Sequence, residues 1–216
     1  MTLLTDIIVL NTTKLGETSV VVHCLSRDYG RRGFIVNVGR RIPSSLLQPL
    51  GILEAKVVEN TKSALWRITS LTPKYPLNGL RQDLSKGAIS LFMSEVLYRT
   101  IKEGTDEDGL FDWCIGDILT LDAIESDFAN YHIRFLLELA VMLGFSPSAD
   151  SLMPFCGDAL GEVEEILRSP FSEAMLVPLS GEKRNAIAES IVRYIAHYSE
   201  SAINLRSLGV LRELFA

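Results

Sequence analysis

The hydrophobic pattern of this 216-residue chain changes its period near residue 75, and this change limits the folds available to it. Before that point, short runs rich in β-branched residues alternate with turn residues. These runs predict five β-strands, at residues 3–10, 19–25, 34–38, 52–58 and 65–71. Five short strands in about 70 residues favour a small closed barrel, because closure leaves no strand edge unpaired.

Pro73 and Pro76 then bracket a linker, and apolar residues beyond it recur at helical spacing. The segment 84–101 is apolar around most of its circumference, which predicts a central helix. Ser169 and Pro170 resemble the opening of another helix, whereas residues 148–161 read as irregular. Further helices are predicted at 110–121, from Asp127 or Asn130 to Gly144, and at 162–167, 182–198 and 208–215. The fold class is therefore α+β multidomain, with a barrel at 1–78 and an all-α domain at 79–216.

Charge divides in the same way. Residues 1–78 hold ten Lys and Arg against five Asp and Glu, a net charge of +5, and the remainder carries −11. Five arginines lie at the two ends of the third predicted strand: Arg27, Arg31, Arg32, Arg40 and Arg41. An arginine-dense segment in an acidic chain suggests a local anionic partner. The alternative is a solvated hairpin whose arginines keep a sheet edge soluble.

Tyr29 lies in a turn between Asp28 and Gly30, where its ring would be available to stack on a nucleic-acid base. Small barrels with cations on their turns are a common form of single-strand binders, in which phosphates contact the basic groups. The aromatic residue and the arginines together therefore predict a nucleic-acid surface on the first domain.

No catalytic constellation emerges from the sequence, so we expect a protein that is not an enzyme. Adjacent strand residues such as His23 and Cys24 point to opposite faces and cannot form a nucleophile–base pair. A hydrolase using His23 or His132 stays an alternative. The dispersed Cys24, Cys114 and Cys156 predict neither a zinc site nor a disulfide framework, so no metal or cofactor is expected.

The cellular compartment is predicted from what the sequence lacks. No apolar run approaches the roughly 18 residues of a membrane span, and the N-terminus has no signal-peptide pattern. A reducing cytosol, with no membrane partner, is the expectation.

Charged residues of the second domain have two interpretations each. Arg134 lies beside Phe135 on an apolar helix, where a guanidinium could hold a partner's carboxylate, or pair with an acid of the same domain. Glu95 and Arg99 are one turn apart and predict an i,i+4 pair. The acidic run 106–108 predicts a solvated loop rather than a cation site.

The chain resembles the RecO family of bacterial DNA-repair proteins, through short segments that keep their order and spacing. In the first half these are Ile8-Val9-Leu10, Gly16-Glu17-Thr18-Ser19, Tyr29-Gly30-Arg31, Gly39-Arg40 and Leu47-Gln48-Pro49-Leu50. In the second half they are Glu95-Val96-Leu97, Arg134-Phe135-Leu136-Leu137, Leu143-Gly144-Phe145 and Leu205-Arg206-Ser207.

The resemblance implies an N-terminal OB-fold, a C-terminal helical domain and a non-enzymatic role in recombinational repair. It implies binding of single- and double-stranded DNA, annealing of complementary strands, and work with RecR. It also implies binding of the acidic tail of the single-stranded-DNA-binding protein, which helps RecA load. Partner-binding residues would be Arg134, Phe135 and Arg206, and DNA-binding residues would be Arg27, Tyr29, Arg31, Arg32, Arg40 and Arg41.

Two departures from the family pattern matter. Many relatives carry four zinc-binding cysteines in the helical domain, whereas this chain has only Cys114 and Cys156 there, so no zinc site is carried over. The basic loop is shorter and reads Asn37-Val38-Gly39-Arg40 before Arg41. An OB-fold adaptor that binds RNA or an acidic protein is the alternative function.

Overall fold

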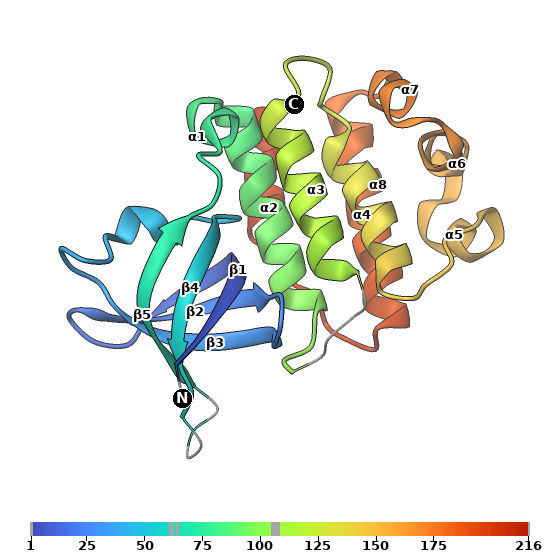
Figure 1. The fold of residues 1–216 in the computed structure, drawn as a ribbon. Helices are drawn as coiled ribbons and strands as arrows, with labels where there is room; N and C mark the ends of the chain where they lie inside the picture. Colours follow the sequence, from blue (N-terminus) through green and yellow to red (C-terminus); the bar gives the residue numbers. More distant parts are fainter. Residues whose placement is uncertain (1, 61–62, 64, 105–108, 216) are drawn as a thin grey trace.

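The computed structural model describes residues 2–60, 63, 65–104 and 109–215, and it places a β-barrel beside a bundle of helices (Figure 1). The strand order β1-β2-β3-β5-β4 closes on itself, with β3 and β5 parallel and the other pairs antiparallel. This arrangement is the OB-fold, so the predicted fold of the first domain is confirmed. The strands are β1 (Thr2–Lys14), β2 (Ser19–Ser26), β3 (Gly30–Asn37), β4 (Ile52–Val58) and β5 (Trp66–Pro73).

The barrel has its own apolar core, formed by alternate strand residues that point inward. Phe34 and Cys24 are fully buried there. The 3₁₀ turn η1 (Ser44–Leu47) follows β3 and adds Leu47 to this core. Near the start of β3, the ring of Tyr29 packs edge-on against Trp66, with 4.9 Å between the ring centroids.

The helical domain begins directly after the barrel. Because β5 ends at Pro73 and the first helix starts at Asn78, we propose that the domain boundary expected at residue 78 lies at this junction. The helices are α1 (Asn78–Gln82), α2 (Leu84–Thr100), α3 (Leu110–Ala123), α4 (Tyr131–Met142), α5 (Ala149–Cys156), α6 (Leu160–Arg168), α7 (Phe171–Leu176), α8 (Gly181–Tyr198) and α9 (Ser207–Leu214), with a 3₁₀ turn η2 (Gly157–Ala159).

Most predicted helices are present, but three details differ. The segment expected to be irregular contains α5, which Ser148 and Ser151 begin with a reciprocal capping box. Pro154 lies inside that helix, where proline is unusual. The short α1 was not predicted at all. Helix α7 begins after Pro170 rather than with that proline as its first helical residue.

Helix α2 is the central element that the sequence predicted. It lies between the barrel and the rest of the bundle, while α5, α6 and α7 are on the far side (Figure 1). Outward-facing barrel residues, among them Ile8, Leu25 and Ile52, are buried in the same apolar cluster as Phe92 of α2. The two domains therefore share a continuous hydrophobic interface and have a defined relative orientation.

Candidate nucleic-acid interface

The structure separates the two arginines that are consecutive on β3. Their side chains alternate across the strand. The guanidinium of Arg31 faces α2 and lies 4.5 Å from the ring centroid of Tyr98. The guanidinium of Arg32 lies 4.2 Å from the ring centroid of Trp66, the first residue of β5. Each cation is thus held by a cation–π contact within the protein.

Arg27 joins the two domains. Its Nη2 donates to Asp112 Oδ1 of α3 at 2.8 Å, its Nε lies 3.6 Å from Asp6 Oδ2, and its guanidinium covers the ring of Phe111. The hydrogen bond from Arg27 lowers the pKa of Asp112. Since two carboxylates already share this cation, a role for Arg27 at a phosphate stays a prediction that the geometry does not favour.

Arg40 and Arg41 lie beyond the other end of β3 and are exposed, and within the described residues neither forms an ion pair. An eight-residue strand extends about 26 Å, which separates them from Arg31 and Arg32. The four arginines are therefore divided between the two ends of β3. Arg40 and Arg41 are the members of the predicted set that are most available to a ligand.

The pair predicted to contact a protein partner is engaged inside the helical domain. Arg134 Nε donates to Glu138, and its Nη1 donates to the carbonyls of Ile166 and Ser169 at 2.7 and 3.2 Å. It thereby satisfies carbonyl groups at the end of α6. Phe135 is only 1% exposed and stacks on Trp113, so the structure makes it a core residue rather than a surface contact.

We expect Arg134→Ala to destabilise the fold by about 1.5–3 kcal/mol, because it removes hydrogen bonds from a charged donor to half-buried acceptors. Urea denaturation measures this effect. Arg168→Ala is the matched control, since its side chain is 73% exposed in an i,i+4 pair and should cost under about 0.5 kcal/mol. If Arg134→Ala kept full stability but lost affinity for an acidic tail peptide, the partner-binding role would be restored.

Glu95 does not form the predicted pair with Arg99. Its carboxylate instead accepts hydrogen bonds from the backbone N–H groups of Arg206 and Ser207 and from the Ser207 hydroxyl. Burial raises the pKa of Glu95, but these hydrogen bonds outweigh it and lower the pKa overall. Glu95, a residue of α2, therefore caps the N-terminus of α9.

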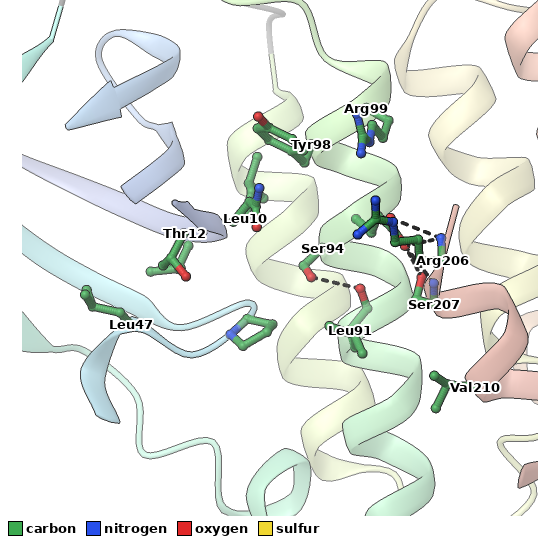
Figure 2. A pocket seen from close by; sticks show the side chains of 14 residues that line it. Leu10, Thr12, Leu47, Leu91, Ser94, Tyr98, Arg99, Arg206, Ser207 and Val210 are labelled. Atoms are coloured by element: carbon green, nitrogen blue, oxygen red, sulfur yellow. Dashed lines mark hydrogen bonds between the residues drawn. The ribbon is translucent and has the colours of Figure 1, made fainter. Parts of the chain in front are cut away.

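A groove of about 510 Å³ lies between the barrel and the helices (Figure 2). Figure 2 shows Leu10 and Thr12 of β1 on one side, α2 along the groove, and Arg206, which directly precedes α9, on the other side. Arg206, which was predicted to bind a partner, is exposed here. Tyr98 and Arg99 also line the groove, and the sequence analysis did not identify them as site residues. Their only signal was an adjacent aromatic and cation in the last turn of the central helix.

The geometry gives no support to the alternative of a hydrolase. His23 is half-buried against Tyr98, while His132 is fully buried and neither of its ring nitrogens has a hydrogen-bond partner. Among the described residues, no three His, Cys, Asp or Glu side chains gather as metal ligands. The acidic run 106–108 lies outside the residues that the structure describes. Among the described residues, no helix is long and apolar enough to cross a membrane.

Comparisons with known proteins agree with this architecture. The family profile described as "Recombination protein O N terminal" matches residues 1–76, and "Recombination protein O C terminal" matches residues 81–161. The protein named DNA repair protein RecO of Bacteroides fragilis is 30% identical, over 96% of this chain and 97% of the relative. The chain belongs to the RecO family. RecO proteins of Phocaeicola vulgatus and Flavobacterium johnsoniae are 29% and 26% identical, over 97% and 100% of both chains.

The two segments that match the RecO family meet at the junction between the barrel and the helices. The N-terminal profile ends at residue 76, between β5 and α1, and the C-terminal profile begins at residue 81 within α1. The RecO resemblance inferred from short segments is therefore confirmed, as is the OB-fold followed by a helical domain.

Proposed function

We propose that this chain is a recombination mediator that binds DNA and anneals complementary single strands without covalent chemistry. The observation that carries the proposal is a closed OB-fold barrel with a net charge of +5, in a chain that matches the RecO family over both domains. Annealing follows if the protein holds the sugar–phosphate backbone while the bases stay open to pair. This work would take place in the bacterial cytoplasm, at the nucleoid during repair.

The strand-binding surface that fits best is the outer face of β2 and β3, which OB-folds use for oligonucleotides. Ser19 and Asn37 are hydrogen-bonded to each other on this face. Arg40 and Arg41 follow the end of β3, and Lys14 ends β1 opposite Val20 of β2. Three exposed cations thus lie near one end of this sheet face, where they would contact phosphates.

We expect the Arg40→Ala, Arg41→Ala double variant to weaken single-stranded DNA binding and to flatten its salt dependence. Two lost phosphate contacts should reduce the slope of log K against log salt by about 1.4, at roughly 0.7 ions per contact. Fluorescence anisotropy at several salt concentrations measures the slope. The control replaces two exposed helical arginines, Arg168 and Arg212, by alanine. A double variant with the wild-type slope would place the site elsewhere.

Protein partners complete the proposed function. The helical domain would receive RecR and the acidic, apolar tail of the single-stranded-DNA-binding protein, so that RecA can load on the released strand. Of the three residues predicted for this purpose, Arg206 is the one at an open groove, which supports it over Arg134 and Phe135.

A second candidate function is an OB-fold adaptor for RNA or an acidic protein, and the exposed cations Arg40 and Arg41 suit those ligands as well. Competition separates the two. If RNA or an acidic peptide displaced labelled single-stranded DNA at far lower concentrations than unlabelled DNA does, the adaptor would be favoured.

A further inference from the structure

Tyr98 connects the outer face of β2 and β3 to the groove between the domains. Its ring centroid lies 5.1 Å from that of His23 on β2, and the guanidinium groups of Arg31 and Arg99 lie 4.5 and 5.6 Å from it. The nearby Arg31 also contributes to the lowered pKa of His23, after burial. Since Tyr98 lines the groove as well, it is a half-buried aromatic ring between two surfaces.

The groove is cationic inside an otherwise acidic domain. Arg99 and Arg206 line it and are exposed, and within the described residues neither makes an ion pair. The one carboxylate among the lining residues is Glu95, and the N–H groups at the start of α9 and the Ser207 hydroxyl occupy it. The positive end of the helix dipole offsets its charge, so it opposes an anionic ligand little.

The groove also offers hydrogen-bonding groups on its barrel side and apolar side chains on its helical side. A β-bulge between Val9 and Asn11 interrupts the pairing of β1 with β2 and places Asn11 and Thr12 along the groove. Amide and hydroxyl groups of this kind commonly contact phosphate and sugar oxygens. Leu91 and Val210, on α2 and α9, are 41% and 39% exposed and give the groove an apolar wall (Figure 2).

We propose that a single DNA strand bound on the β2–β3 face continues past Tyr98 into the groove between the domains. Tyr98 would stack on one base, and Arg99 and Arg206 would contact phosphates. The helical domain would then extend the DNA site, through a local cationic lining in a domain whose net charge is −11. This inference rests on the proposed DNA binding by the barrel. The direct contact of Tyr98 with β2 and β3 favours a nucleic-acid strand over an acidic peptide, because it makes the two surfaces continuous.

The test compares short and long oligothymidines, since one OB-fold covers about 4–16 nucleotides. For a strand of about 20 nucleotides, the Arg99→Ala, Arg206→Ala variant should lose about 1.4 from its salt slope, at roughly 0.7 ions per contact. For a strand of about six nucleotides the same variant should bind as tightly as the wild type. Equal behaviour of variant and wild type on the long strand would overturn the proposal.

Tyr98 is tested by two substitutions. Tyr98→Leu should weaken binding of the long strand about 5- to 150-fold, the range expected for one lost base–aromatic stack, whereas Tyr98→Phe should bind like the wild type. Thermal unfolding of both variants checks the fold. If Tyr98→Leu proves to be unfolded, the Arg99→Ala, Arg206→Ala variant, which changes only exposed side chains, tests the proposal in its place. Equal binding by folded Tyr98→Leu and wild type would count against the stack.

Two further outcomes separate this inference from the function on which it rests. If the Arg40, Arg41 variant loses DNA affinity and the Arg99, Arg206 variant does not, the barrel binds DNA and the extension is wrong. If an acidic peptide binds the wild type, fails to bind the Arg99, Arg206 variant and does not compete with DNA, the groove is a protein site and the extension is wrong. If the peptide and the long strand compete for the wild type and the Arg99, Arg206 variant loses affinity for both, the strand enters the groove and the extension is supported.

Discussion

Replacing Gly79 with alanine is expected to destabilise the protein by roughly 3 kcal/mol. Gly79 lies in α1, directly after the barrel. A Cβ atom there would overlap the backbone carbonyl oxygen of Asp122 and lie 3.1 Å from its Oδ1. The obstacle is backbone rather than a flexible side chain, so either α1 or the end of α3 has to move.

That movement would break two partly buried hydrogen bonds. Asp122 Oδ1 accepts from the backbone N–H of Leu80, and the Asp122 carbonyl accepts from Lys86 Nζ, both at 2.9 Å. Lys86 is only 6% exposed, so a shift leaves a buried cation poorly paired. Chemical denaturation measures the loss. Gly116→Ala in α3 is the control, since nothing lies within 4 Å and alanine should stabilise the helix by up to about 1 kcal/mol. Equal stabilities of Gly79→Ala and wild type would contradict this packing.

The second large effect is an acid sensitivity that depends on His132. The ring lies between Phe92 and Phe215, and burial, together with nearby Arg184, lowers its pKa to about 3. Because the folded state prefers the neutral ring, the contribution of His132 to the free energy of unfolding is fully present above the unfolded pKa of about 6.5. This contribution is lost as the pH falls toward 3. Between pH 7.5 and pH 5 the protein should lose about 2 kcal/mol through this residue, at 1.36 kcal/mol per pH unit.

A buried carboxyl group acts in the opposite direction in an overlapping range. Burial raises the pKa of Asp117 to about 7, although the Tyr131 hydroxyl donates a hydrogen bond to it. The pKa of Asp117 is higher in the folded than in the unfolded state. Its contribution to the free energy of unfolding is therefore fully present below about pH 4 and is lost as the pH rises toward 7. The total pH dependence of the wild type is therefore shallow, and the two contributions have to be separated by substitution.

His132→Phe should accordingly gain about 2 kcal/mol relative to the wild type when the pH is lowered from 7.5 to 5. Urea denaturation at both pH values gives the difference, and Asp117→Asn should shift it in the opposite direction. His197→Phe is the control, since that ring is exposed to water in the folded state. A His132→Phe variant that keeps the wild-type pH dependence would show that the buried ring is not the cause.

The sequence predicted the elements better than it predicted the arginine partners. Strands and helices follow local patterns, so the barrel and the central helix were recognisable from β-branched runs and from apolar spacing. Helix α5 was missed because Pro154 and Gly157 read as breakers, although Ser148 and Ser151 provide a capping box. Helix α1 was missed because it is short. It is also held by a distant residue, since the N–H of Leu80 donates a hydrogen bond to Asp122, 42 residues further along the chain.

Side-chain partners depend on tertiary contacts that no local pattern contains. Arg27 was predicted at DNA, but Asp112 and Phe111 reach it from the other domain. Arg31 contacts Tyr98 of α2, although the sequence placed it with Arg40 at one surface. The resemblance to the family located the correct protein class, while the groove at Arg206 became visible only when β1, α2 and α9 were assembled.

Annealing of complementary single-stranded DNA by the purified chain tests the central claim most directly. The wild type should accelerate pairing of two labelled oligonucleotides, with a rate that falls as salt rises, and the Arg40→Ala, Arg41→Ala variant should be slower at every salt concentration. The Arg168→Ala, Arg212→Ala control should anneal like the wild type. A folded wild-type protein that neither binds single strands nor accelerates their pairing, yet binds RNA or an acidic peptide, would contradict the proposed function.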